Sequence, residues 1–377
     1  MYEVMEITVK EVTGKKELKV FYQFQNRLYK DCKQYVPSLD ADQKSTLTED
    51  PALDYCTRKM WLAYKGDKVV GRIQAIVNPR YNEFYNLKRV RFGWFDFVED
   101  FEVAKALLDT AMAWGREQGM TQVHGPLFYN TLGKQGMLVE GFENTPPYNC
   151  LYNFPYYVEY MERMGFVKET DWIQFRLNGS QGAPEKLQRM ADILMKRYNL
   201  RLLDIRKIKG DLKKELIQKF FRIYNECFQA VHNFIPLTPK EIEKTGNAYF
   251  SLLKPELTCM VVDQNNDIAA FGLCFPSLSE ALKKANGSLF PFGWYHILKA
   301  YRKYDTIDLM MVGSNPAWAQ RGLSAIYHQN LATNFKERHL KYCITNPQID
   351  TNIAAIKVWE SYDTEPFMRR RCWIKDL

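Results

Sequence analysis

The sequence predicts an α/β protein built from two tandem units, each with a mixed central sheet flanked by helices. Three observations support this fold class. The chain has 377 residues, more than one ordinary core contains and about right for two. A stretch rich in Gly, Ser and Pro, Asn178–Glu185, divides the chain nearly in half. The two halves then repeat one order of expected elements, which indicates an internal duplication.

Hydrophobic periodicity and turn residues define the elements of the first half. A helix at 17–30 precedes a hairpin at 60–77 that turns at Lys65, Gly66 and Asp67. The remaining expected elements are a strand at 89–97, a helix at 101–118, a strand at 121–127, a helix at 156–164 and a strand at 172–177. Gly119 and Gly165 follow the last residues of two of these helices, as left-handed C-caps do.

The second half shows the same order. A helix at 211–230 and a hairpin at 258–275 come first, followed by a strand at 306–313, a helix at 323–339, a strand at 341–346, a helix at 353–362 and a strand at 367–374. Hairpins followed by helical crossovers predict a sheet with mixed strand directions. We expect one domain at 1–178, a linker at 179–189 and a second domain at 190–377.

Composition is typical of a globular protein and excludes several classes. Hydrophobic residues make up 46% of the chain, and the net charge of +8 comes from Lys and Arg spread along it, which favours weak attraction to anions. The eight cysteines are dispersed, with no CxxC motif, so we expect reduced thiols and no metal site. No window approaches the ~18 apolar residues of a membrane span, and no signal peptide is recognisable. A cytoplasmic protein without a membrane partner is therefore expected.

A candidate phosphate-binding loop lies between the strand at 306–313 and the next helix. It reads Ala319, Gln320, Arg321, Gly322, Leu323 and Ser324. Backbone N–H groups at a helix N-terminus, exposed where Gly removes the Cβ, bind anions such as a pyrophosphate, and Arg321 adds positive charge. The competing interpretation is that Gly322 only starts a helix.

This loop and its surroundings resemble the GNAT superfamily of N-acetyltransferases, whose loop usually has Arg or Gln, two residues, Gly, one residue, then Gly or Ala. Here Ala319 and Ser324 depart from that pattern. The late helix, with Asn352, Val358 and Trp359, and the sequence MERMGF at 161–166 resemble the same superfamily. The resemblance covers nearly the whole chain and implies acetyl-CoA or another acyl-CoA as a substrate. The implied donor contacts are Met311, Val312, Gln320, Arg321, Gly322, Leu323, Ser324, Asn346 and Asn352.

The general acid of the superfamily, a Tyr, is replaced in both halves. Met161 stands at its position in the first half and Trp359 in the second, and neither side chain can protonate a thiolate. Tyr362 lies three residues after Trp359, on a neighbouring part of the same helix face, and is the candidate substitute, although it can equally well be a packing residue. Asp308 and Glu226 are the candidate bases, and their alternative is an ordinary solvated or ion-paired carboxylate.

The first half lacks a corresponding phosphate loop. No Gly occurs at 96–108, where Glu99, Asp100 and Glu102 stand instead, so we expect this half not to bind coenzyme A. A long segment at 129–157, without evident secondary structure, either holds an acceptor or only seals the region between the halves. Its candidate acceptor contacts are Asn130, Glu140, Tyr148, Asn149 and Asn153.

Three functional hypotheses follow. The first is an N-acyltransferase that moves an acetyl group from acetyl-CoA to a small-molecule or peptide amine. The second is a catalytically degenerate tandem that binds a ligand, and the third is a transferase that uses aminoacyl-tRNA, the one nucleic-acid partner considered. A serine hydrolase and a dinucleotide oxidoreductase are disfavoured because GxSxG and GxGxxG are absent.

Overall fold

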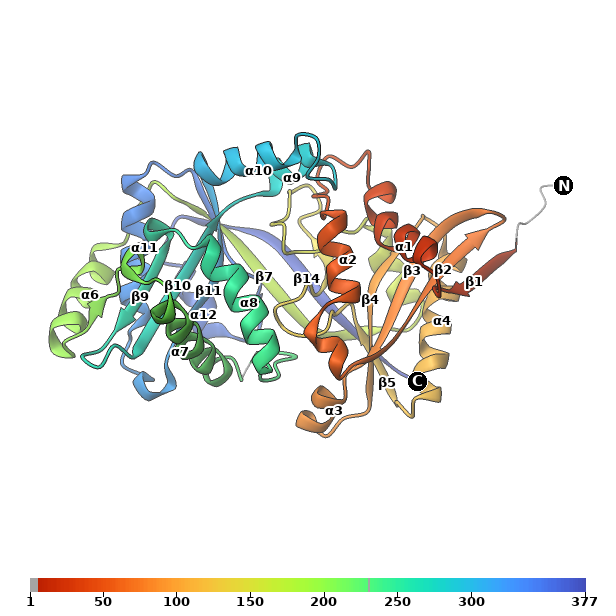
Figure 1. The fold of residues 1–377 in the computed structure, drawn as a ribbon, viewed down its shortest axis with the longest axis horizontal. Coiled ribbons are helices and arrows are strands. Elements are labelled where there is room, and N and C mark those ends of the chain that lie inside the picture. Colours follow the sequence, from red (N-terminus) through yellow and green to blue (C-terminus); the bar gives the residue numbers. More distant parts are fainter. Residues whose placement is uncertain (1–5, 230) are drawn as a thin grey trace. The chain divides into compact units, whose positions relative to one another are not determined.

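The computed structural model describes residues 6–229 and 231–377, which form two compact units. Unit 1 comprises the chain up to Trp172 together with Leu278–Lys299 and Met368–Leu377, and unit 2 comprises Ile173–Ser277 and Ala300–Phe367. Figure 1 shows helices packed against strands in each part of the chain, as expected for an α/β protein.

Unit 1 contains a mixed sheet in the order β1, β2, β3, β4 and β5, followed by the last residues of β14. Its neighbours are antiparallel except for β4 and β5, which are parallel. The strands are β1 (Ile7–Glu11), β2 (Thr57–Lys65), β3 (Lys68–Val77), β4 (Arg89–Phe97), β5 (Gln122–Gly125), β6 (Met137–Glu140), β7 (Val167–Asn178) and β14 (Thr364–Asp376). The helices are α1 (Lys15–Leu28), α2 (Asp40–Thr48), α3 (Pro79–Tyr85), α4 (Phe101–Glu117), α5 (Tyr156–Arg163), α9 (Ser279–Ala285) and α10 (Gly293–Arg302).

The packing of α4 on the sheet explains why the sequence forms this helix here. Its apolar residues recur with helical spacing, and Val103 and Leu107 are fully buried against β3. A Cβ on Gly71 of β3 would lie 2.7 Å from a methyl carbon of Leu107, so the close approach of helix and strand requires glycine there.

Unit 2 contains a second mixed sheet in the order β7, β12, β11, β10, β9 and β8, in which only β11 and β12 are parallel. The additional strands are β8 (Arg201–Leu202), β9 (Thr258–Val262), β10 (Ile268–Pro276), β11 (Thr306–Ser314), β12 (Tyr342–Ile344) and the short β13 (Gln348–Ile349). The helices are α6 (Glu185–Arg197), α7 (Asp211–Cys227), α8 (Pro239–Leu252), α11 (Ser324–Glu337) and α12 (Ile353–Trp359).

Opposite faces of the second sheet carry different helices. Ala270 of β10 packs in the core that contains α6 and α11, whereas the ring of the next residue, Phe271, lies 4.7 Å from that of Phe220 on α7. Successive residues of a strand point to opposite faces. The crossover helix α11 and the helix α7 therefore cover different faces of this sheet.

The compact units differ from the boundaries expected at 179–189, because the closing strands of the two halves are exchanged. Residues 176–178 of β7, from the first half, pair with β12 of unit 2. Residues 373–376 of β14, from the second half, pair with β5 of unit 1. Sequence periodicity locates a strand but does not specify its partner, so an exchange of equivalent strands is invisible in it.

Most expected elements are present, with shifted ends. The segment at 129–157 contains a strand, β6, which pairs with Arg369–Arg371 of β14, so it is not a structureless loop. The expected helix at 211–230 ends at Cys227, and its expected last residue, Ala230, lies outside the described residues. Helices α8, α9 and α10 were not anticipated. Among the described residues, no helix is both long and apolar enough to cross a bilayer.

Candidate functional site

The parallel strands β11 and β12 separate into a fork in unit 2. Their pairing ends at Asp308 and Ile344, while β11 continues to Ser314. The next residue after β12, Thr345, instead bonds to β7: its N–H donates to the Phe175 carbonyl at 2.9 Å, and its Oγ1 accepts from the Phe175 N–H at 2.9 Å. Beyond the fork, the edge of β11 that faces away from β10 has no partner strand in the described chain. Its peptide groups can therefore bind a ligand.

A β-bulge alters β11 directly after the fork. Leu309 pairs with Cys274 and Met311 with Leu273, so Met310 is an extra residue without a cross-strand partner. A bulge bends the strand and redirects its peptide groups. The expected backbone donors, Met311 and Val312, lie at this bulge.

Asp308 is a buried carboxyl group at the fork. Its side chain is 2% exposed, and neither carboxylate oxygen has a hydrogen-bond partner among the described residues. Burial raises the pKa of Asp308 to about 7, and Ser277, which lies nearby without reaching hydrogen-bond geometry, opposes this shift only in part. A carboxylate with a pKa near neutrality is suited to take a proton from an ammonium group. Asn346, two residues after Ile344, adds a buried amide oxygen that also has no partner in the described chain.

The N-terminus of α11 lies at the end of the crossover that leaves β11. Gln320 and Gly322 adopt positive φ values of 61° and 73°, which turn the chain into the helix. The N-cap residue is Leu323, and no side chain caps this end. The first N–H groups of a helix lack intrahelical acceptors and carry a partial positive charge. They form a possible anion site that the protein itself leaves open.

Two of the other expected donor contacts are already engaged. The Arg321 guanidinium stacks on the rings of Trp318 and Tyr198 at 4.8 and 5.3 Å, and no described carboxylate pairs with it, so its charge remains available to an anion. The Asn352 side chain accepts a hydrogen bond from the Ala355 N–H at 3.2 Å and thereby caps α12. Its oxygen has a structural task.

A small apolar cavity of about 30 Å³ lies between α11, α12 and the strands β7, β11 and β12. Tyr362 lines it, and the Tyr362 hydroxyl is buried without a hydrogen-bond partner in the described part of the chain. Burial raises the pKa of Tyr362, so the hydroxyl stays protonated and can donate a hydrogen bond. Trp359 donates its indole N–H to the Gln348 oxygen at 2.9 Å and packs in the core, a structural role.

His328 is the functional candidate that sequence reasoning missed. It lines the same cavity, and its ring lies 5.1 Å from Trp359 and 6.1 Å from Tyr362. Burial lowers the pKa of His328 to about 4, so it is neutral near pH 7. The signal was weak, because a lone His inside a helix has no accompanying motif.

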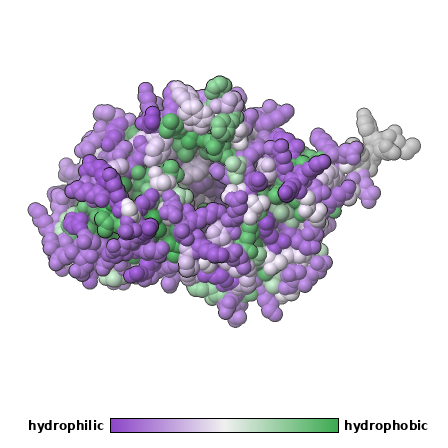
Figure 2. All heavy atoms as spheres, in the orientation of Figure 1, coloured by the Kyte–Doolittle hydropathy of each residue, from purple (hydrophilic) through white to green (hydrophobic). Residues whose placement is uncertain are grey.

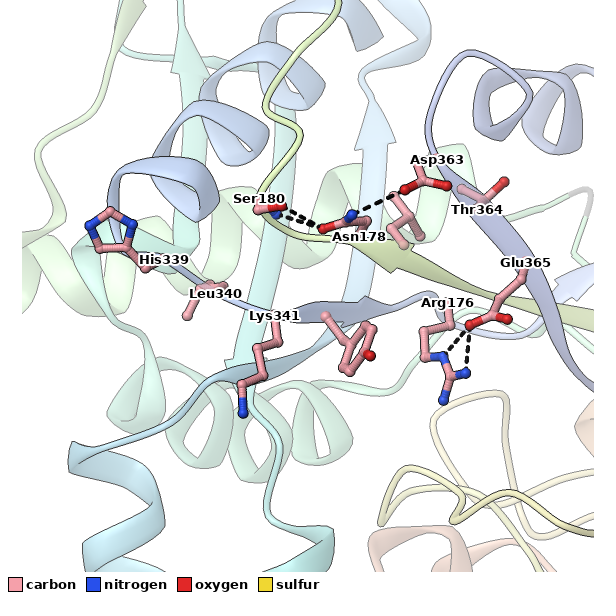
Figure 3. Close-up of a pocket in the computed structure, with 11 residues that line it drawn as sticks. Arg176, Asn178, Ser180, His339, Leu340, Lys341, Asp363, Thr364 and Glu365 are labelled. Atoms are coloured by element: carbon pink, nitrogen blue, oxygen red, sulfur yellow. Dashed lines mark hydrogen bonds and ion pairs between the residues drawn. The ribbon is translucent and has the colours of Figure 1, made fainter.

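A larger depression of about 470 Å³ lies on unit 2 where β12 begins. Figure 3 shows its polar rim, in which Arg176 pairs with Glu365 and Asn178 bonds to Asp363. These charged groups already have partners, and His339 and Lys341 lie before or at the start of β12, at the end opposite the fork. We therefore assign the donor site to the fork and not to this depression.

The other expected contacts are not gathered at the fork. Glu226 is exposed near the end of α7. In unit 1, Glu140 pairs with Arg369 at 3.2 Å, and the Asn130 side chain accepts from the Leu132 N–H at 3.0 Å. The Asn153 side chain makes three hydrogen bonds to backbone groups of Leu138 and Phe154.

These bonds favour a structural role for Asn153 and Asn130. Asn149 contacts the Cys150 thiol, and Tyr148 has interactions within the protein. The assignment of an acceptor to this segment remains a prediction.

One group of metal-ligating residues occurs in unit 1. Donor atoms of His124, Glu169 and Cys372 all lie within 4.8 Å of one another. Glu169 already pairs with Arg89 at 2.6 Å, and Arg91 is close enough to lower the pKa of His124 further. A divalent cation replacing the thiol proton would increase the positive charge buried beside two guanidinium groups. We interpret this cluster as a structural hydrogen-bond network.

Comparison with known proteins agrees with the fold. No family model matches the chain. Protein YghO of Escherichia coli (strain K12) is 26% identical over 377 residues, covering 98% of this chain and 95% of YghO. Bacterial ceramide synthase of Caulobacter vibrioides (strain NA1000 / CB15N) is 26% identical over 328 residues, covering 84% of this chain and 83% of that protein.

Solved structures give the fold class. A tandem GNAT protein from the clavulanic acid biosynthesis pathway superposes with a TM-score of 0.58 and 12% identity, over 98% of both chains. The protein therefore has the tandem GNAT fold, a mixed α/β fold, and the resemblance inferred from the sequence is confirmed at that level.

Proposed function

We propose that the protein is an acyl-CoA-dependent N-acyltransferase whose donor site is the fork of unit 2. The observation that carries this proposal is the position of Asp308, a buried carboxyl group with a pKa of about 7, where β11 and β12 separate. A transferase needs an anion site for the coenzyme, donors for the thioester carbonyl and a base for the amine. Each has a candidate beside this fork.

The residues of the fork divide these tasks. The N–H groups at the start of α11, with Arg321, bind the pyrophosphate, and the free edge of β11 at Met311 and Val312 polarises the thioester carbonyl. Asp308 accepts a proton from the ammonium group, and the amine nitrogen then attacks the thioester carbon. Tyr362 donates a hydrogen bond to the departing sulfur, and solvent supplies its proton, since a tyrosine whose pKa is raised is a poor acid.

The acceptor belongs to the same proposal. An amine matches a base with a pKa near neutrality, and acetyl-CoA is the simplest donor. The name of the Caulobacter relative adds long-chain amines and longer acyl-CoA donors to those that deserve testing, because ceramide is an N-acylated long-chain amine.

Calorimetric titration of the full chain with acetyl-CoA and a long-chain acyl-CoA tests the donor site. The full chain is required, because a fragment that begins after the linker lacks the part of β7 that pairs with β12. We expect saturable binding, weakened roughly fivefold by Arg321→Ala through loss of a charge-assisted contact. Arg222→Ala, on exposed α7, is the matched control and should bind like wild type.

Release of free thiol in the presence of amines then tests the transfer step. Thiol release that depends on both the amine and the acyl-CoA is expected. If the full-length protein bound no acyl-CoA, the transferase proposal would be wrong, and a degenerate ligand-binding tandem or a tRNA-dependent transferase would take its place.

A further inference from the structure

Unit 1 exposes an unusual set of large apolar side chains in one short segment, 288–298. Phe290 and Phe292 are 79% and 68% exposed. The other exposed members of this segment, which we call the aromatic surface, are Trp294, Tyr295 and Leu298. Such contiguous exposure is rare on proteins without a binding partner and usually marks an interaction site.

Hydrogen bonds hold these rings outside the core. The Gly287 carbonyl accepts from the Asp40 N–H at 2.9 Å, and the buried Ser279 hydroxyl donates to the Pro146 carbonyl at 2.9 Å, which fixes α9 and the following turn to unit 1. The Trp294 N–H donates to the Leu289 carbonyl at 2.9 Å, and its indole N–H donates to the Pro291 carbonyl at 3.0 Å. The exposed rings therefore stand on a well-bonded backbone and not on a free loop.

The exposed side chains share one face of α10. Trp294, Tyr295 and Leu298 are spaced at i, i+1 and i+4, and the exposed Lys299 follows on the same face. Figure 2 shows hydrophobic and intermediate spheres gathered over α9 and α10 at the top of the view. The solvent face of this helix is thus apolar, opposite to the usual pattern for a surface helix.

The charge around the aromatic surface has one sign. No Asp or Glu occurs at 281–304, whereas Lys283, Lys284 and Lys299 do. Lys283 is neutralised by Glu280 at 2.9 Å, but Lys284 and Lys299 are exposed and make no ion pair with any residue that the structure describes. Aromatic residues flanked by unpaired lysines are typical of helices that lie in the interfacial region of anionic bilayers.

A second copy of the protein fits this surface less well. A twofold interface places the same patch on both partners, so the unpaired lysines of one copy would face those of the other. The anionic headgroups of a bilayer instead complement the lysines, while the rings enter the boundary between headgroups and acyl chains.

We propose that the aromatic surface of residues 288–298, with Lys284 and Lys299, attaches the protein reversibly to the surface of an anionic phospholipid bilayer. The contact is peripheral and needs no spanning helix. It goes beyond the transferase activity and can be tested without any assay of transfer.

Co-sedimentation with vesicles tests this proposal. The full chain should bind vesicles of phosphatidylcholine and phosphatidylglycerol in equal parts, bind phosphatidylcholine alone weakly, and dissociate partly at high salt. Lys284→Glu with Lys299→Glu should weaken binding by at least about tenfold, since each cation near an anionic surface contributes appreciably. Phe290→Ser with Phe292→Ser should weaken it on the order of tenfold or more by removing the inserted rings.

Controls separate this surface from nonspecific adsorption. Phe84→Ser removes another exposed aromatic residue of unit 1 and should leave vesicle binding unchanged. All the altered positions are exposed, and unchanged thermal unfolding of the variants establishes that they fold. Failure of the wild-type protein to bind anionic vesicles, or equal binding by wild type and both double variants, overturns the proposal. A dimer that becomes a monomer on Phe290→Ser with Phe292→Ser, without vesicle binding, identifies a self-association surface and also overturns it.

Discussion

The two units place the same strand arrangement in different chemical states. In each, two parallel strands separate and the longer strand carries a bulge: β4 and β5 part after Arg91 and His124, as β11 and β12 do after Asp308 and Ile344. In unit 1 the Arg91 guanidinium donates to the Phe128 and Tyr129 carbonyls at 2.9 and 3.0 Å. Asp308, at the equivalent place in unit 2, has no such bond within the described chain.

The fork of unit 1 is also filled by its own side chains. The rings of Phe128 and Trp94 are stacked at 3.5 Å, and Trp94 adopts a positive φ of 45° in the bulge. The N-terminus of α4 is capped by Asp100, whose carboxylate accepts from the Glu102 and Val103 N–H groups. The corresponding end of α11 has no side-chain cap. One unit thus satisfies its polar groups internally, while the other leaves them for a ligand, which fits a donor site in unit 2.

The pH dependence of stability should show the largest effect of this difference. The folded-state pKa of Asp308 is raised to about 7 from an ordinary value of 3.8, so the unfolded state releases this proton first as pH rises. The free energy of unfolding should fall between about pH 4 and pH 7 and the loss should persist above pH 7, by an amount on the order of 3 kcal/mol. Denaturant unfolding of wild type and Asp308→Asn across this range measures it. The same slope in both would contradict the assignment.

Catalysis should show the next effect. Asp308→Asn removes the proposed base, so kcat should fall at least about a hundredfold while the dissociation constant of the acyl-CoA stays within a factor of two or so. The wild-type rate should rise with pH through about pH 7, as the Asp308 carboxyl loses its proton. A pH profile that keeps this rise in Asp308→Asn would assign the base to another residue.

A charge at the open helix end should have a smaller effect on donor binding. Gly322→Glu places a carboxylate beside the proposed pyrophosphate site and should weaken acyl-CoA binding roughly thirtyfold. The matched control is Gly119→Glu in unit 1, which also has positive φ, 75° against 73°, and open space around a new Cβ. Equal losses of affinity in the two variants would attribute the effect to backbone strain and not to the ligand.

The capped helix end in unit 1 should give the smallest effect. Asp100→Ala removes the N-cap of α4 and its ion pair with Lys65, and we expect a loss of about 1 kcal/mol of stability. Acyl-CoA binding measured by calorimetry should not change. If binding became stronger or acquired a second site, the capped end would be a masked donor site, and the contrast between the units would be one of degree.

The sequence by itself determined the fold class and most of the elements. The spacing of apolar residues defines β4, α4, β11 and α11, because burial of one helix or strand face leaves a periodic record in the chain. The acidic run that contains Asp100 and the glycine at Gly322 likewise record local demands, a helix cap and a positive φ.

Only the tertiary structure decided what depends on distant partners. The exchange of β7 and β14, the burial of Asp308 without a partner, and the meeting of His328 with Tyr362 join segments far apart in the sequence. The exposure of Phe290 and Phe292 is of the same kind, since an apolar run alone predicts burial. Whether a residue is buried or exposed depends on which surfaces surround it, and these surfaces come from the whole fold.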